Sequence, residues 1–159
     1  MGFRSGGADG VPVLIVDDDQ VTSRLIGGVF EMNGIGPVVR VGTLGVAGRA
    51  IATTRYRAVV ADLHLPDGNG MELVHLMRRG RRSQNRDATL IVCSAYARAR
   101  TTHLLLRLGA DAVLDKPADP ETLLACLARG RRGAAAADRG HDARSRPAGA
   151  RQAAPDAGG

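Results

Sequence analysis

Acidic side chains stand directly after two apolar runs of this sequence. Asp17 and Asp18 follow Val-Leu-Ile-Val, and Asp62 follows Ala-Val-Val-Ala and precedes a loop rich in Pro, Gly and Asn. A lone Asp in such a place often only caps a turn or the next helix. Three carboxylates that meet repel one another, so they require a cation, and a hard divalent ion such as Mg²⁺ suits oxygen ligands.

A hydroxyl and an ammonium group follow two later apolar runs. Ser94 closes the run 89–93, and Lys116 comes shortly after residues 112–114. A bound cation and a fixed ammonium group suit phosphoryl transfer, in which the protein mainly positions groups and neutralises charge. An Asp carboxylate can itself be the nucleophile. Asp62 is the candidate because it comes from the centre of the predicted site, and Ser94 could hydrogen-bond a phosphoryl oxygen.

These residues meet only if the apolar runs are parallel strands of one sheet. Short apolar runs alternate along the chain with segments whose apolar residues recur at helical spacing, which predicts an α/β sheet with helices on both faces. Such sheets bind ligands at the carboxyl ends of their strands. The predicted strands are residues 13–16, 37–41, 58–62, 89–93 and 112–114, and the predicted helices are residues 20–33, 43–54, 71–79, 97–108 and 120–129.

Composition and charge limit the domain organisation. A chain of 159 residues holds one domain with a proper core, expected over residues 11–129. Residues 1–10 are predicted to be a disordered lead. Residues 130–159, rich in Ala, Gly and Arg, are predicted to be a disordered tail. Of the net charge of +6, +4 belongs to residues 129–159, so most of the basicity lies in the tail.

Two further features indicate a cytoplasmic protein without a membrane partner. No apolar run reaches the length of a membrane span, and the first ten residues lack the apolar stretch of a signal peptide. Cys93 and Cys126 lie apart in apolar patterns, which favours buried, reduced thiols over a metal site.

Several short motifs occur in a fixed order over residues 11–129. They are Leu-Ile-Val-Asp17-Asp18-Asp19, Asp62-x-x-x-Pro66-x-x-x-Gly70, Ser94-Ala95, Gly109-Ala110-Asp111 and Lys116-Pro117. Each motif alone is a weak signal, but together, in order and at this spacing, they are highly specific. The segment resembles the receiver domain of two-component response regulators.

The resemblance implies a flavodoxin-like, doubly wound, five-stranded parallel sheet with strand order 2-1-3-4-5. It implies that Mg²⁺ is held directly by Asp18 and Asp62, through water by Asp17, and by the main-chain carbonyl of His64. The side chain of His64 is expected to point to solvent.

The resemblance also implies a reaction partner and a switch. Asp62 would take a phosphoryl group from a histidine kinase or a histidine phosphotransfer protein, Lys116 would pair with it, and Ser94 would reorient onto it. The Lys116–Pro117 bond would be cis. The chain would catalyse only its own phosphorylation and dephosphorylation.

One position departs from the family pattern. Receivers usually carry an aromatic residue three positions before the lysine, and here that residue is Val113. The nearest aromatic is Tyr96, two residues after Ser94. Tyr96 is a hypothetical replacement that partly takes over the switch or covers the phosphate. The simpler interpretation makes Tyr96 a surface residue without a role and Val113 part of the core.

Other function classes compete with this interpretation. A phosphatase of the haloacid dehalogenase type would need a second Asp two residues after the nucleophile, where this chain has His64. An Arg-rich tail could bind nucleic acid weakly, but no aromatic residues are interleaved for stacking, so no specific nucleic acid partner is expected. A phosphorylation-independent adaptor with a receiver fold remains the main alternative.

The sequence shows no helix-turn-helix pattern and no catalytic output module. We therefore expect a stand-alone receiver that acts by protein contact or as a phosphate relay. Its downstream partner is expected on the face formed by the fourth helix, fifth strand and fifth helix, which would expose Arg98, Arg100 and Arg107 among apolar neighbours.

Overall fold

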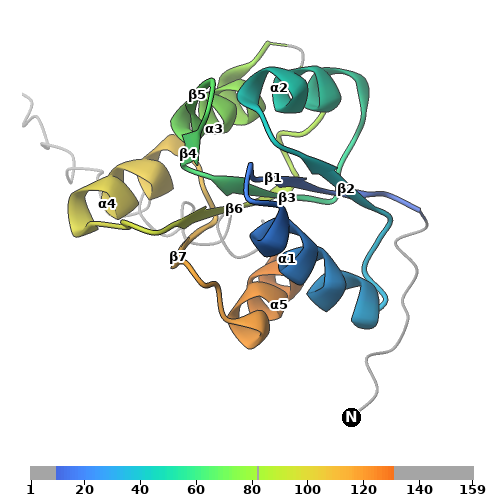
Figure 1. Ribbon diagram of the computed structural model, residues 1–159. Coiled ribbons are helices and arrows are strands. Elements are labelled where there is room, and N and C mark those ends of the chain that lie inside the picture. Colours follow the sequence, from blue (N-terminus) through green and yellow to red (C-terminus); the bar gives the residue numbers. More distant parts are fainter. Residues whose placement is uncertain (1–9, 82, 131–159) are drawn as a thin grey trace, which may run out of the picture.

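A parallel sheet forms the centre of the protein (Figure 1). The computed structural model describes residues 10–81 and 83–130. The sheet has five strands in the order β2-β1-β3-β6-β7. The strands are β1 (Val13–Val16), β2 (Val38–Val41), β3 (Ala58–Asp62), β6 (Thr89–Ser94) and β7 (Ala112–Asp115). This order confirms the predicted flavodoxin-like topology. The segments predicted to be disordered, residues 1–10 and 130–159, lie outside the described residues except for Gly10 and Gly130.

The three central strands are buried on both faces. Every residue of β1, β3 and β6 is buried, whereas the edge strands β2 and β7 are only partly so. A strand covered on both faces needs apolar side chains at consecutive positions, which is why these strands occur in the sequence as uninterrupted apolar runs.

Helices cover the two faces unequally. The helices are α1 (Gln20–Met32), α2 (Leu44–Thr53), α3 (Gly70–Arg79), α4 (Ala99–Leu108) and α5 (Pro120–Arg129). One apolar cluster joins one face of the sheet to α2, α3 and α4, and a second joins the other face to α1 and α5 (Figure 1). Successive residues of β1 alternate between the clusters, because side chains of a strand point to opposite faces in turn.

Polar side chains and glycine fix the helix ends that the sequence predicts. Asp119 precedes Pro120 and accepts a hydrogen bond from the amide of Thr122 at 2.8 Å, which caps α5. Gly109 ends α4 with a left-handed φ of 115°.

The predicted boundaries differ from the structure in a few places. The predicted helix start at residue 97 is wrong, because the amide of Arg98 donates to the carbonyl of Tyr96 at 2.8 Å and this turn delays α4 to Ala99. The loop after Asp62 contains an unpredicted two-stranded hairpin, β4 (His64–Leu65) and β5 (Gly68–Asn69).

Other local predictions are tested as well. The Lys116–Pro117 bond is cis, as predicted, and Gly36–Pro37 is a second cis bond. Cys93 is buried and its burial raises the thiol pKa to about 12, whereas Cys126 is only partly buried. None of the helices in the described part of the chain is long and apolar enough to cross a membrane.

A nearly buried ion pair joins α3 to the loop between α4 and β7. Nη2 of Arg78 lies 2.8 Å from Oδ2 of Asp111, and the side chains are only 7% and 10% exposed. The same guanidinium donates to the carbonyls of Gly109 and Ala88 at 2.7 and 2.9 Å. Oδ2 of Asp111 also accepts the amide of Leu90 at 2.8 Å. Both charges are therefore hydrogen-bonded as well as paired, which burial requires.

Removal of the carboxylate of Asp111 should destabilise the fold strongly, because it breaks a nearly buried ion pair with Arg78 and removes the acceptor of the Leu90 amide. We expect Asp111→Ala to lower the free energy of unfolding by about 3–5 kcal/mol, measured by urea denaturation followed by circular dichroism. The control is Glu31→Ala, which breaks the exposed Arg40–Glu31 pair and should cost no more than about 1 kcal/mol. Equal losses in the two variants would contradict the structural role of Asp111.

Candidate functional site

Three carboxylates meet at the carboxyl ends of β1 and β3. These strands are neighbours in the sheet, with Val16 in register with Ala61. Asp17 and Asp62, which follow those residues, are 6% and 8% exposed, and Asp18 is exposed. One oxygen from each of the three carboxylates lies within 4.8 Å of the others. The cluster predicted from the sequence is therefore formed.

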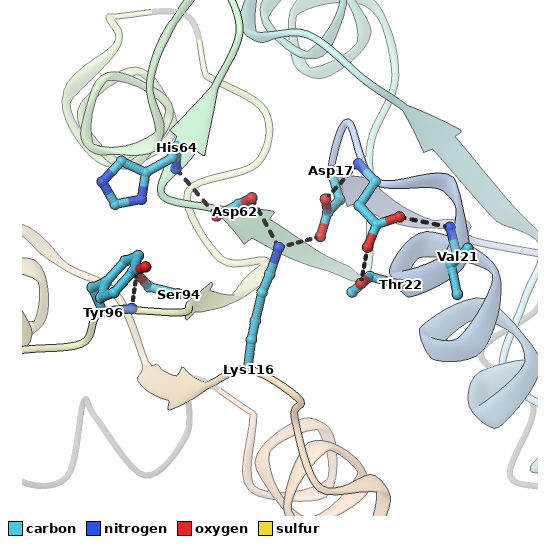
Figure 2. Close-up of polar contacts among 9 residues, drawn as sticks. Asp17, Val21, Thr22, Asp62, His64, Ser94, Tyr96 and Lys116 are labelled. Carbon is cyan, nitrogen blue, oxygen red and sulfur yellow. Dashed lines mark hydrogen bonds and ion pairs between the residues drawn. The ribbon is translucent and has the colours of Figure 1, made fainter.

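Lys116 provides the positive charge of the cluster. Figure 2 shows its side chain extending from the end of β7 toward both buried acids. Its Nζ lies 2.7 Å from Oδ2 of Asp17 and 2.8 Å from Oδ2 of Asp62. Burial by itself would lower the pKa of Lys116, but the hydrogen bonds to the two carboxylates outweigh it, so the pKa is raised. The ammonium group is thus fully charged at neutral pH. Lys116 is also the only lysine of the chain.

The third acid of the Asp17-Asp18-Asp19 run has a different task. Oδ1 of Asp19 accepts the amide of Val21 at 3.0 Å, and Oδ2 accepts the hydroxyl of Thr22 at 2.6 Å. The hydroxyl of Thr22 and the amide of Val21 lower the pKa of Asp19. Asp19 is therefore the N-cap of α1, and only the first two acids of the run face the cluster.

Ser94 ends β6 with its hydroxyl already hydrogen-bonded. The side chain is fully buried, and its Oγ accepts the amide of Tyr96 at 3.2 Å (Figure 2). The amide of Lys116 donates to the Ser94 carbonyl at 3.0 Å, which ties the end of β6 to the start of the lysine loop. Tyr96 itself is 74% exposed.

His64 and Val113 have the environments expected for residues without a direct catalytic role. The side chain of His64 is exposed, as predicted, and its amide donates to Oδ1 of Asp62 at 3.1 Å. Figure 2 shows its imidazole turned away from Asp62. Val113 is half-buried in β7 and packs against the apolar cluster between the sheet and helices α2, α3 and α4.

The donor set of the cluster fits a magnesium ion. Mg²⁺ prefers carboxylate and carbonyl oxygens and retains several waters. The carboxylate of Asp18 makes no hydrogen bond or ion pair within residues 10–81 and 83–130, so it is open to a metal ion. The single positive charge of Lys116 does not balance three carboxylates, so the remaining negative charge favours a second cation.

Comparison with known proteins is consistent with this geometry. Residues 13–128 match the family model of the response regulator receiver domain. The chain belongs to this family. The match covers all five strands of the central sheet and nearly all of α5.

Individual relatives support the same assignment. The photosynthetic apparatus regulatory protein RegA of Rhodovulum sulfidophilum is 35% identical over 116 residues, which are 72% of this chain and 60% of RegA. The acid tolerance regulatory protein ActR of Rhizobium meliloti is 36% identical over 116 residues, 72% of this chain and 57% of ActR. This receiver chain therefore spans less than two thirds of the length of these curated relatives.

A solved structure shows the same fold. The CheY-like response regulator receiver domain protein from Methanospirillum hungatei JF-1 is 28% identical and superimposes with a TM-score of 0.65. The similarity covers 73% of this chain and 89% of that one.

Sequence reasoning did not single out two polar residues, one beside the receiver site and one at the opposite, amino-terminal end of the strands. Asp67 bonds to the first turn of α2, and Arg78 pairs with Asp111. Asp67 was indistinguishable from a turn-forming residue in Pro-Asp-Gly. The sequence does place Asp111 in the Gly-Ala-Asp motif, but its partner lies 33 residues away.

The hydrogen bonds of Lys116 predict how the protein titrates. A pKa raised on folding means that Lys116 stabilises the native state fully below about pH 10.4, the ordinary lysine value, and that this stability is lost as pH rises through the folded pKa. We expect the single lysine, observed by NMR in ¹³C-lysine-labelled protein without Mg²⁺, to titrate above free lysine.

Asp17→Asn is the matched variant, because it removes one of the two negative charges that contact Lys116 and keeps the size of the side chain. The lysine pKa should fall in this variant. A wild-type lysine that titrates at or below the value of free lysine would contradict the ion pairs.

Proposed function

We propose that Asp62 accepts a phosphoryl group from a phosphohistidine of a histidine kinase or a histidine phosphotransfer protein, in a reaction that depends on Mg²⁺. The convergence of Asp17, Asp18 and Asp62, with the ammonium group of Lys116 bonded to two of them, carries this proposal. Family membership supports it, because receivers of this family work with such donors.

The reaction transfers one phosphoryl group and needs no oxidant or reductant. A carboxylate oxygen of Asp62 forms a bond to phosphorus while the bond between phosphorus and the donor imidazole nitrogen breaks, and its electron pair returns to that nitrogen. Lys116 stays charged and balances the negative charge near Asp62. The bound Mg²⁺ would supply further charge neutralisation for the phosphoryl oxygens. Later attack by water returns phosphate and free Asp62, so the chain acts only on itself.

The residues that would hold Mg²⁺ are Asp18 and Asp62 directly, Asp17 through water, and the main-chain carbonyl of His64. Asp18 is the exposed member of the cluster and is therefore the most accessible to an ion. Asp17 already accepts the ammonium of Lys116 and the amide of Asp19 at 2.9 Å, which suits an indirect contact.

Ser94 would be the group that senses the phosphate. Its buried hydroxyl accepts a hydrogen bond from Tyr96. A phosphoryl group on Asp62 offers new acceptor oxygens, toward which the Ser94 hydroxyl would turn to donate. Such a local change biases the equilibrium between two conformations of the adjacent elements, here α4, β7 and α5.

The phosphorylated domain would signal by contact with a downstream protein, as a stand-alone receiver in the cytoplasm. The exposed part of α4 offers two apolar side chains, Leu104 and Leu106, which are 46% and 44% exposed. Arg98, Arg100 and Arg107 are exposed around them, as the sequence predicts. An apolar patch with basic neighbours suits a partner with apolar and acidic side chains.

A phosphorylation-independent adaptor is the second candidate, and the half-buried Val113 favours it. At this position receivers usually carry the aromatic that moves with the hydroxyl, and a valine side chain lacks the length for such a switch. If Tyr96 does not replace that aromatic, phosphorylation would not be transmitted to α4.

Phosphorylation of Asp62 is directly testable. We expect the protein to gain one phosphoryl group on incubation with Mg²⁺ and acetyl phosphate, measured by intact mass. Asp62→Asn, which preserves size and removes the nucleophile, should gain none, and neither should wild-type protein in EDTA.

Two results would contradict the proposal. A phosphoryl group that persists in Asp62→Asn would mean that another residue is the acceptor. Folded wild-type protein that binds Mg²⁺ and is never phosphorylated would favour the adaptor.

Tyr96 should affect the lifetime of the phosphate if its exposed ring covers Asp62. We expect Tyr96→Ala to change the dephosphorylation half-life by about 3- to 10-fold, which corresponds to about 0.6–1.4 kcal/mol in the barrier. The half-life is measured from the decay of the phosphorylated mass after removal of the donor. The control is Leu104→Ala, which truncates an exposed side chain within α4, the helix that follows Tyr96. It should leave the half-life unchanged. The hypothesis fails if Tyr96→Ala alters neither the half-life nor partner binding.

A further inference from the structure

Asp67 lies in the turn of the β4–β5 hairpin and bonds to a distant helix. Its Oδ1 accepts the amide of Leu44 at 2.7 Å, and its Oδ2 accepts the amide of Gly45 at 2.9 Å. These are the first amides of α2, which have no acceptor within the helix. The amides of Gly45 and Leu44 hold the pKa of Asp67 below its ordinary value. An ionised carboxylate therefore joins the hairpin to the start of α2.

Both segments joined by Asp67 border the acidic cluster. The hairpin begins at His64, whose amide donates to Asp62. On the other side, α2 is preceded by Gly42. A Cβ at Gly42 would lie 3.7 Å from the Cα of Asp18, so this loop packs directly on the backbone that carries the other two acids. Asp67 thus connects the two loops that border the carboxylates.

Close packing surrounds these hydrogen bonds. A Cβ on Gly68, next to Asp67, would come within 2.6 Å of Cδ2 of Leu44, and a Cβ on Gly45 would lie 3.4 Å from Oδ2 of Asp67. Leu44 and Leu65 are both buried in the same apolar cluster. The hairpin is therefore fitted to the first turn of α2, and a side chain at position 68 would have to displace the end of the Leu44 side chain.

Simple capping of α2 does not account for Asp67. The helix has its own N-cap, Thr43, whose Oγ1 accepts the amide of Val46 at 3.3 Å. A local cap can be supplied by residues next to the helix. The additional effect of Asp67 is to fix a segment that lies 22 and 23 residues further along the chain.

We propose that Asp67 is a positioning residue of the metal site. By holding the hairpin against α2, it fixes the main-chain carbonyl of His64 relative to Asp18. Groups that orient metal ligands without touching the metal commonly contribute 10- to 100-fold to metal affinity. The inference rests on the proposed function, since it assumes that Mg²⁺ binds at this cluster.

The first test needs no metal. Amide hydrogen exchange measured by NMR in Mg²⁺-free protein reports whether the hairpin is held. Asp67→Ala should accelerate exchange at the Gly70 amide, which donates to the Leu63 carbonyl at 2.8 Å, and at the His64 amide. Thr43→Ala, which removes a cap from the same helix end, should leave both rates unchanged. Unchanged rates in Asp67→Ala would overturn the positioning role.

The second test measures Mg²⁺ affinity by isothermal titration calorimetry. Asp67→Ala should weaken binding by at least about tenfold, and Thr43→Ala should stay within about twofold of wild type. Asp67→Asn has the same charge as the alanine variant but keeps one oxygen for the amide of Leu44, so its loss should be smaller. Equal losses in Asp67→Ala and Asp67→Asn would indicate a loss of charge alone and overturn the inference.

The two proposals fail differently. If wild-type protein binds Mg²⁺ and Asp67→Ala binds it equally well, or Thr43→Ala is weakened as much, the positioning role is wrong and the proposed function stands. If wild-type protein does not bind Mg²⁺, the proposed metal site is wrong, and the role of Asp67 in metal binding falls with it. The exchange rates then still decide whether Asp67 holds the hairpin.

Discussion

The contact of one ammonium group with two nearly buried carboxylates is the constraint on which the site depends. Asp17 and Asp62 are held close together by the adjacent strands β1 and β3, and Asp18 adds a third charge. Carboxylates so close to one another are unfavourable unless a cation lies between them. Lys116 bonds to both buried acids, and this pairing offsets part of the negative charge of the cluster without closing the exposed side of Asp18.

The strand order of the sheet brings Lys116 within reach of both buried acids. The lysine follows β7, which is separated from β3 by β6, so its long side chain has to reach across the end of one strand. The amide of Lys116 donates to the Ser94 carbonyl, and this hydrogen bond fixes the backbone position from which the lysine side chain extends. The two apolar clusters pack both faces of the sheet, and this packing keeps the strand ends that carry the charges aligned.

Much of this arrangement could be predicted from the sequence, because the features concerned are local. Fully buried strands require apolar runs, so β1, β3 and β6 were recognisable, and the acids after them were candidates for the cluster. Caps such as Asp119 depend on amides only a few residues away.

Other features depend on distant partners and have no local pattern. The hairpin strands β4 and β5 have two residues each, too few for a period to be visible. Asp67 and Arg78 bond to residues 22 to 33 positions away, and their types alone suggest only a turn and a solvated helix face. Sequence reasoning found the groups that could react with phosphate. It missed Asp67, which holds the loops beside them, and Arg78, which joins α3 to the opposite end of the strands.

The uniqueness of Lys116 has a consequence for how such sites can be located. The chain carries 22 Lys and Arg residues, and at every one of those positions except 116 the residue is arginine. An arginine would bring a broad, planar group with fixed donor directions, whereas a compact ammonium group fits between two carboxylate oxygens. In an arginine-dominated composition the rare residue type marks the place where shape, and not charge alone, decides which cation is acceptable. The one lysine of the chain therefore stands where a compact ammonium group, and not a guanidinium, lies between two buried carboxylates.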